Sequence, residues 1–536
     1  MKMLKIKAVP GAMRWAIVYF LLLGLISVIL GQDASWDLRN YHFYNPYMLL
    51  EGRFKYDVLP AQIQTFFNPL MDVPFFMSIH WLKMPPVVFG FLLGGFHGLN
   101  IWLVHQILYY SLTNVSEKYR EIMSFAGAIT GIRGAAYLSE LGTNIGDSTS
   151  SVFVLGGVAI VVYELYRNRG IKTGRVFLAG LLLGLATGLK LTTAIYSVSL
   201  IIAINFLPNK IRDKVSNLVS LISGMGLGFL GTAGYWFLLM WNNFANPVFP
   251  FFNTIFKSPY IETDSNLQDL RFLPKDIYQT LFYPFYFAGE QSLVAEVKFR
   301  DIRIALAYIF IVMLVGYAIY RLSSKSIPQA NHIINPHILS FLTAFYVTAY
   351  VIWQKGFSIY RYLLVLELLT PVLLVLILGY IYPHKKAVMI ISLTLFALII
   401  TTVKPLDWWR IGWSENYFGI NSNELQRYEN STIVLYGDEP TSYIAPYFPG
   451  STRFVRLKGN AGIREGTKMR ANAEAFIEET PERNLYILKT DANKKSGDTA
   501  KELAQEDLGV MRQKCQPLST HLEKYEICRL DKLDEN

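Results

Sequence analysis

The run RWAIVYFLLLGLISVILG, residues 14–31, leads directly into the polar segment QDASWDLRNYHFYNPYMLLEGRFKYDVLPAQIQTFFNPLMD, residues 32–72. An apolar run of about twenty residues is long enough to cross a bilayer as a helix. Similar runs recur along the chain, so we predict a mainly α-helical, polytopic membrane bundle of about eleven transmembrane helices. The predicted spans lie near residues 14–31, 85–111, 121–138, 148–166, 174–189, 191–207, 216–240, 301–320, 337–353, 361–382 and 387–403.

The composition also indicates a membrane protein. Of the 536 residues, 52% are hydrophobic and 17% are charged, which is too little charge to cover a soluble chain of this size. The formal net charge of +10 does not predict a nucleic-acid partner, because basic residues in a membrane protein first report its topology. The first apolar run is too long for the core of a signal peptide, so we predict a retained anchor.

The loops between the spans alternate in character, which predicts the topology. Short loops rich in Lys and Arg belong in the cytoplasm. We therefore predict a multi-pass protein of the bacterial cytoplasmic (inner) membrane, with a cytoplasmic N-terminus and an extracytoplasmic tail after Val403. The residues that mark the cytoplasmic side are Lys2, Lys5, Lys7, Arg14, Lys118, Arg120, Arg167, Arg169, Lys172, Arg175, Lys210, Arg212, Lys214, Arg321, Lys325, Lys385 and Lys386.

The pattern of loops predicts three parts. Residues 1–403 form the transmembrane catalytic domain, with a first outer loop at 32–72 and a second at 241–300. The second loop is rich in Phe, Tyr, Pro and Asn, which predicts short helices at the membrane interface. Residues 404–429 are a connector, and residues 430–536 form a small extracytoplasmic α/β domain. In that domain STIVLYGDEP and NLYILKTD read as strands and KMRANAEAFIEET as an amphipathic helix.

The only two cysteines, Cys515 and Cys528, lie in a segment that reads as two strands. A disulfide between them fits an oxidising compartment, and two free thiols fit the sequence nearly as well. Neither cysteine has the partners of a zinc site.

The predicted outer face collects ionisable groups, which are costly at a membrane and are functional candidates by default. Cations stabilise a phosphate leaving group, and a carboxylate orients or deprotonates an acceptor. Structural alternatives remain open at this stage: Asp37 or Asp147 as helix caps, and Lys190 or Arg361 reaching to headgroups. If helical, Asp37, Tyr41 and Tyr44 share one face. The candidates are Asp37, Arg39, Tyr41, His42, Asp147, Lys190, Lys355, Tyr360 and Arg361.

Four motifs occur in a fixed order along the chain. WDLRNYHFY begins at Trp36, GDSTSSVFVLGGVAIVVYELY at Gly146, RVFLAGLLLGLATGLKLTTAIY at Arg175 and YRYLLVLELLTP at Tyr360. This order resembles the GT-C superfamily of integral membrane glycosyltransferases that use polyprenyl-phosphate-linked sugars, in particular its families 39, 83 and 87. The resemblance covers residues 14–403, and the tail from Asn430 has no matching motif.

The resemblance implies roles for individual residues. It makes Asp37 the catalytic carboxylate that activates the acceptor, and places Lys190, Arg361 and more loosely Arg39 near the lipid phosphate. Some members bind a divalent metal, but Leu38 stands after Asp37 where others have a second acidic residue, so the cofactor stays unknown and a divalent metal stays open without a clear ligand motif.

The predicted partners are a polyprenyl-phosphate sugar donor, membrane lipids and a glycan or lipid-linked acceptor, with no nucleic acid. Three alternatives remain: a transporter or flippase of lipid-linked sugars, a ligase or polymerase of the O-antigen type, and a glycan-binding assembly or sensor protein.

Overall fold

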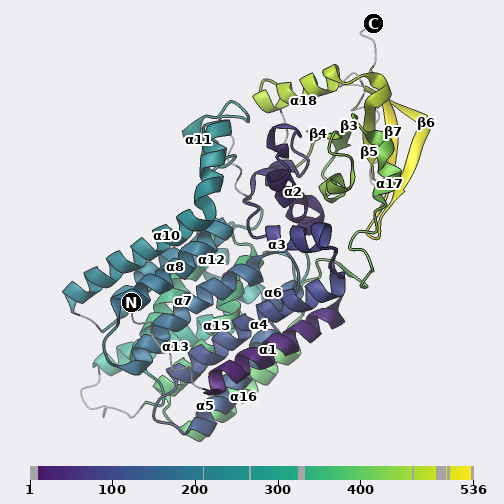
Figure 1. Cartoon of the computed structure of the whole chain (residues 1–536). Helices are drawn as coiled ribbons and strands as arrows, with labels where there is room; N and C mark the ends of the chain where they lie inside the picture. The colour runs from purple at the N-terminus through teal and green to yellow at the C-terminus, as the bar shows by residue number, and fades with distance from the viewer. Residues whose placement is uncertain are drawn as a thin grey trace. The chain divides into compact units, whose positions relative to one another are not determined.

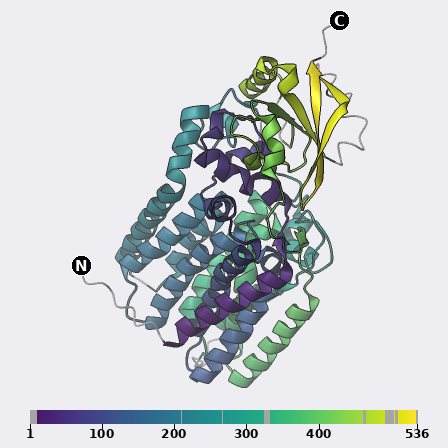
Figure 2. The same ribbon diagram turned by 45° about the vertical axis from the view of Figure 1, so that its right-hand side comes forward.

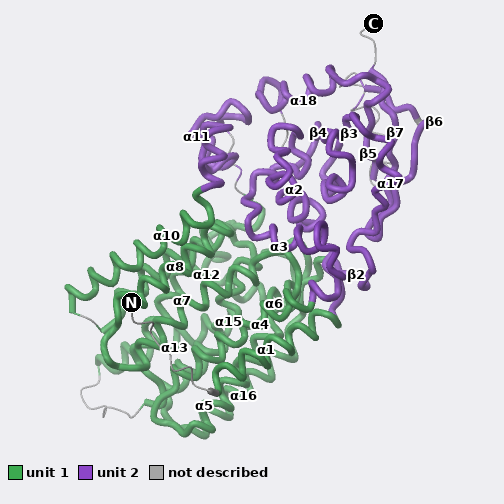
Figure 3. Tube along the Cα trace, viewed as in Figure 1, with its two compact units in different colours: residues 1–29, 91–234, 268–408 green, residues 30–90, 235–267, 409–536 purple. Residues whose placement is uncertain are grey.

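A computed structural model describes residues 10–208, 210–264, 267, 269–323, 332–460, 464–490, 503 and 508–532. The predicted cytoplasmic residues Lys2, Lys5, Lys7 and Lys325 lie outside the described residues. The chain forms two compact units, shown in Figure 3. Unit 1 comprises residues 1–29, 91–234 and 268–408, and unit 2 comprises residues 30–90, 235–267 and 409–536.

Unit 1 is a helical bundle (Figure 1). In the described part of the chain, eight helices are long and apolar enough to cross a membrane, and 173–189 and 191–206 form shorter apolar helices. The predicted membrane bundle is therefore confirmed. The helices lying wholly or mainly in this unit are α1 (Pro10–Leu30), α4 (Pro86–Ser111), α5 (Glu117–Ile132), α6 (Ala135–Glu140), α7 (Asp147–Arg167), α8 (Thr173–Leu189), α9 (Ala194–Ala203), α10 (Ile211–Phe244), α12 (Ile277–Tyr286), α13 (Arg303–Ser323), α14 (Pro336–Gly356), α15 (Leu364–Ile381) and α16 (Lys385–Thr402).

The single span predicted at 121–138 is wrong, because the chain forms two helices there. Helix α5 ends at Ile132 and α6 begins at Ala135. A Cβ on the intervening Gly134 would lie 1.8 Å from an oxygen of Glu367, so no larger side chain fits. The break turns the first backbone amides of α6 toward that carboxylate, which accepts hydrogen bonds from Ala136 and Tyr137 at 3.0 Å.

Glycines set the spacing between α8 and α10. A Cβ on Gly180 would lie 2.2 Å from the carbonyl oxygen of Leu221, and one on Gly184 would lie 2.1 Å from that of Met225. Both distances are far below van der Waals contact, so the helix backbones touch here. Small residues at a spacing of four allow this close packing of membrane helices.

Unit 2 contains a five-stranded sheet, part of which is drawn in yellow in Figure 2, with strand order β4-β3-β5-β7-β6 (labelled in Figure 1). Strand β3 pairs in parallel with β4 and with β5, and β7 pairs antiparallel with β5 and β6. The predicted strands, helix and final hairpin are all present, while β4 was not predicted. The strands are β1 (Gln32–Asp33), β2 (Arg410–Ile411), β3 (Thr432–Tyr436), β4 (Arg453–Lys458), β5 (Leu485–Lys489), β6 (Leu508–Ser519) and β7 (Lys524–Lys532), and the helices are α2 (Tyr44–Leu50), α3 (Val73–Phe76), α11 (Asn253–Phe256), α17 (Ser422–Leu425) and α18 (Lys468–Glu479).

The first outer loop shares its core with the C-terminal sheet. Phe43 and Tyr44 belong to the same buried apolar cluster as Val434 and Val455. Val58 also pairs in parallel with Val455, so the loop adds a bridge beside β4. Strand β1, at the start of the loop, pairs with β2 in the connector.

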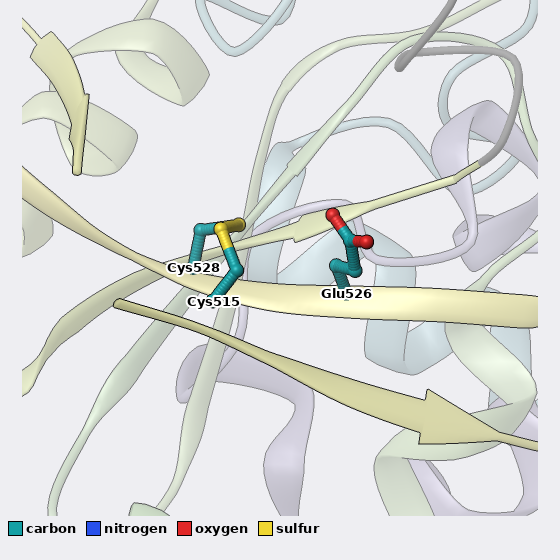
Figure 4. Close-up of side chains that lie close together, drawn as sticks. All are labelled: Cys515, Glu526 and Cys528. Atoms are coloured by element: carbon teal, nitrogen blue, oxygen red, sulfur yellow. A yellow bond between two sulfur atoms is a disulfide. The ribbon is translucent and has the colours of Figure 1, made fainter. Parts of the chain in front are cut away.

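Cys515 and Cys528 are opposite each other on β6 and β7 and form a disulfide, with Glu526 beside it (Figure 4). These three side chains are the group of potential metal ligands found among the described residues, with ligand atoms within 4.8 Å of one another. Because a disulfide offers no thiolate, the group does not fit a metal in this state.

Replacing Gly184 by Val is expected to lower the free energy of unfolding by about 3 kcal/mol, because the new side chain forces α8 and α10 apart. Thermal unfolding of the detergent-solubilised protein measures this as a lower Tm. Gly226→Val on α10 is the control, since no atom lies within 4 Å of a Cβ there. Equal Tm changes in the two variants would contradict the packing argument.

Candidate functional site

A salt bridge joins two of the predicted site residues in unit 1. The Lys190 ammonium lies 2.8 Å from Oδ2 of Asp147 and donates to the carbonyl oxygen of Ile145 at 2.8 Å. Lys190 stands between α8 and the next short turn with φ −146°, an extended conformation that ends α8. Gly146, with φ +93°, precedes α7 and makes Asp147 its first residue. Asp147 therefore pairs with Lys190 and does not act as the N-cap considered from the sequence.

A narrow pocket lies next to this salt bridge and is lined by charged, hydroxyl-bearing and apolar side chains. The ring of Tyr362 lies between two cations, since its centroid is 5.8 Å from Nζ of Lys190 and 5.4 Å from the Arg361 guanidinium carbon. The hydroxyl of Tyr196 donates to the carbonyl oxygen of Tyr362. The lining residues are Asp147, Ser150, Ser151, Thr192, Thr193, Tyr196, Arg361, Tyr362, Leu364 and Val365.

The hydroxyl groups of this pocket differ in their hydrogen bonds. Ser150, Ser151 and Thr193 donate to backbone carbonyl oxygens. Oγ1 of Thr192 is buried and has no hydrogen-bond partner among the described residues. A buried hydroxyl without a partner is unusual in a folded protein and is a donor available to a ligand.

Glu140, which was not among the residues predicted from the sequence, is a buried carboxylate that binds the backbone next to Asp147. Glu140 is fully buried at the end of α6 and accepts a hydrogen bond from the backbone amide of Ser148 at 2.9 Å. Burial and, next, the nearby Asp147 raise the pKa of Glu140 well above its ordinary value, while Lys190 and Arg361 oppose this shift. Its acidic side chain in the apolar stretch AAYLSELG was a signal that could have identified it.

A second buried network positions α6 itself. The Glu367 carboxylate on α15 accepts the amides of Ala136 and Tyr137, as described above, and Asp301 forms a salt bridge with Arg303. The guanidinium group of Arg303 also donates to the carbonyl oxygen of Thr130 at 2.8 Å. These groups connect the start of α13 and α15 to the break between α5 and α6.

Two candidates in unit 1 lie elsewhere. Lys355 is exposed in the last turn of α14 and does not line the pocket. Tyr360 is fully buried and packs against Phe299 with ring centroids 4.3 Å apart. Its position is that of a core residue.

The first-loop candidates lie in unit 2, around a π-helical turn at Leu38–His42. Asp37 precedes this turn, makes no side-chain capping hydrogen bond and is partly exposed. The shared face of Asp37, Tyr41 and Tyr44 was predicted for an α-helix, and the chain forms a π-helical turn here instead, in which hydrogen bonds join residues five apart.

The residues after Asp37 are buried and engaged within unit 2. The Arg39 guanidinium pairs with Glu523 at 2.5 Å, and Nδ1 of His42 lies 2.8 Å from Oδ1 of Asp72. Tyr41 packs on the ring of His42 with centroids 4.0 Å apart. Of the four candidates in this loop, only Asp37 is partly exposed.

A sequence model described as "Glycosyltransferase family 87" matches residues 66–334, half of the chain. The chain belongs to glycosyltransferase family 87. It is therefore a membrane glycosyltransferase of the GT-C type. The matched residues include Asp147 and Lys190, whereas Asp37 and Arg361 lie outside them. No curated protein matches the chain.

Two solved structures show similarity to the chain. ArnT from Cupriavidus metallidurans bound to undecaprenyl phosphate has a TM-score of 0.45 and 13% identity, covering 97% of this chain and 98% of that chain. The oligosaccharyltransferase of Archaeoglobus fulgidus in complex with Zn and sulfate has a TM-score of 0.45 and 12% identity, covering 94% of this chain and 72% of that chain.

The raised pKa of Glu140 predicts a specific pH dependence of stability. Between the ordinary glutamate pKa of 4.5 and the higher folded value, the folded protein holds a proton that the unfolded chain has lost. Stability should therefore fall as pH rises above 4.5. Glu140→Gln keeps an oxygen that can accept the hydrogen bond from the Ser148 amide but cannot titrate. Its stability should therefore decrease less with rising pH than that of the wild type.

Thermal unfolding of the wild type and Glu140→Gln from pH 5 to pH 8 measures the difference. Glu415→Gln, which changes an exposed carboxylate, should keep the wild-type pH slope. An identical slope in Glu140→Gln and the wild type would show that Glu140 does not hold the proton.

Proposed function

We propose that the protein transfers a sugar, hexosyl or pentosyl, from a polyprenyl-phosphate-linked donor to a glycan or lipid-linked acceptor outside the cytoplasmic membrane. One observation carries this proposal. In unit 1, Arg361 lines a pocket in which the buried hydroxyl of Thr192 has no hydrogen-bond partner among the described residues, and Lys190 forms a salt bridge with Asp147 in the pocket wall. Such a pocket suits the phosphate group of the donor.

The donor set around the pocket supports phosphate binding. An ammonium group has three N–H donors, and the salt bridge to Asp147 and the bond to Ile145 occupy two of them. The third is available for a phosphate oxygen, and the planar guanidinium of Arg361 suits two such oxygens.

In the proposed reaction, an acceptor hydroxyl or amine attacks the anomeric carbon of the sugar. The new glycosidic bond forms as the bond from that carbon to the phosphate oxygen breaks, and the lipid phosphate leaves with the electron pair. Asp37 takes the proton of the acceptor, and Lys190 and Arg361 stabilise the negative charge on the phosphate. This displacement inverts the anomeric configuration.

Two observations support the proposed orientation in the membrane. The short loops between helices are basic at positions such as Lys210 and Lys385, which favours the cytoplasm for that side. The disulfide between Cys515 and Cys528 favours an oxidising compartment for the C-terminal sheet. The N-terminus is then cytoplasmic and the sheet extracytoplasmic.

Asp37→Asn should lower kcat about 100- to 10,000-fold, because an amide cannot accept the proton. The assay incubates the purified protein in vesicles with a polyprenyl-phosphate sugar and measures the glycosylated product and the released lipid phosphate. Release of a lipid diphosphate instead would favour a ligase or polymerase, and sugar translocation without a new glycosidic bond would favour a transporter. Asp276→Asn keeps a capping side chain at α12 and is the control. Full transfer by Asp37→Asn would refute the role of Asp37.

Lys190→Gln should weaken the binding of undecaprenyl phosphate about 10- to 100-fold, the effect of losing a charge-assisted hydrogen bond of about 1.5–3 kcal/mol. Titration of the lipid against intrinsic fluorescence measures the Kd. Lys190→Arg keeps the charge and guards against a folding defect, and exposed Lys386→Gln should bind normally. An unchanged Kd in Lys190→Gln would contradict the proposal that the lipid phosphate binds at this pocket.

A further inference from the structure

The turn that follows Asp37 is held by residues of the C-terminal sheet domain nearly five hundred positions later in the chain. Arg39 lies in this turn, with only 6% of its surface exposed. Its guanidinium group pairs with Glu523 at 2.5 Å and lies 4.5 Å from the ring centroid of Trp409. A buried guanidinium without its carboxylate would remain an uncompensated charge, so this pair constrains the turn.

Glu523 is itself fixed on both sides. Its second carboxylate oxygen accepts a hydrogen bond from the hydroxyl of Tyr525 at 2.6 Å. Its backbone amide donates to Oγ1 of Thr520 at 2.9 Å, which holds the tight connection between β6 and β7. The hydroxyl of Tyr525 also contacts that of Tyr443 at 3.0 Å. The carboxylate that receives Arg39 therefore belongs to a rigid network and is not a mobile surface group.

The next residue of the turn is held in the same way. The hydroxyl of Ser442 donates to the carbonyl oxygen of Asn40. The Asn40 side chain donates to the carbonyl oxygen of Ala61 at 3.1 Å. Gln62 in turn donates to the carbonyl oxygen of Asp438, at the end of β3, at 3.0 Å. Both flanks of the loop thus rest on the segment that follows β3.

The loop also continues the sheet. The amide of Val58 donates to the carbonyl oxygen of Phe454 at 2.9 Å, and the amide of Arg456 donates to that of Val58 at 2.9 Å. The buried guanidinium of Arg456 donates to the carbonyl oxygen of Pro60 at 2.9 Å. Arg53 forms a bidentate salt bridge with Asp57, both contacts at 2.8 Å. These bonds fix the backbone at the other end of the loop.

We propose that Glu523 is a positioning residue for the transfer reaction, which acts through Arg39 on the turn beside Asp37. The C-terminal sheet is then the platform that orients the Asp37 carboxylate. A π-helical turn is rare, and such turns are frequent at functional sites, where surrounding contacts hold them. Loss of the Glu523 contact lets the turn rearrange and misplaces Asp37. This inference rests on the proposed role of Asp37.

The test compares Glu523→Ala with Glu523→Gln and with the control Glu479→Ala, which removes an exposed carboxylate on α18. Glu523→Ala should lower kcat about 10- to 100-fold, as expected for a displaced catalytic group, and leave the Kd for undecaprenyl phosphate unchanged. Glu523→Gln keeps an acceptor oxygen for Arg39 and should recover part of the rate. Glu479→Ala should match the wild type.

A double variant separates positioning from general damage. If Glu523 acts through Asp37, Glu523→Ala should have little further effect on kcat in the Asp37→Asn protein. The same fold loss in both backgrounds would overturn the proposal. Hydrogen exchange gives a readout independent of catalysis, and amides 38–42 should exchange faster in Glu523→Ala. Unchanged exchange of these amides in Glu523→Ala would also overturn the positioning role of Glu523. Full sugar transfer by Asp37→Asn would instead overturn the proposed function, while the exchange result would still report whether Glu523 holds the turn.

Discussion

Two buried carboxylates that accept backbone amides determine the geometry of unit 1 around its pocket. Glu367 accepts the first amides of α6, and Glu140 at the end of α6 accepts the amide of Ser148 at the start of α7. Each bond satisfies donors that a helix start would otherwise leave unpaired. Because α6 is only six residues long, its two ends are fixed together. This arrangement fixes the position of Asp147, the first residue of α7. The salt bridge to Asp147 in turn fixes the position of the Lys190 ammonium.

Unit 2 uses charge differently, to join segments that are far apart in sequence. Arg39 and Arg456 are both buried, and their partners lie about four hundred or more positions away in the chain. The guanidinium group of Arg456 donates to the carbonyl oxygens of Pro60 and Gly437 at once, whereas that of Arg39 pairs with Glu523 and lies over the ring of Trp409. The apolar core around Phe43 and Val455 is therefore shared by the loop and the sheet. The first loop is structurally part of the C-terminal domain, although the helices from α4 to α16 separate the two in sequence.

The sequence predicted the elements better than the contacts between them. Apolar length and strand pattern were sufficient for the membrane helices and for β3, β5 and α18, because those signals are local. The break at Gly134 was missed because its cause, Glu367, lies more than two hundred residues away. Asp147, Lys190 and Arg361 were selected from charge at predicted membrane edges, and that signal applied to Glu140 as well. No local pattern could show that Arg39 is neutralised by Glu523.

The partner of Arg39 changes how its charge should be interpreted. The positive charge of Arg39 is already balanced by the carboxylate of Glu523, and its guanidinium lies over the ring of Trp409. Lys190 differs, since its salt bridge and carbonyl contact leave one N–H donor, and the pocket next to its partner Asp147 holds the hydroxyl of Thr192. The proposed phosphate-binding role therefore falls to residues of unit 1. In the proposed reaction, unit 2 contributes the carboxylate of Asp37 and the framework that holds it, so the proposal assigns binding of the donor and activation of the acceptor to separate sets of contacts.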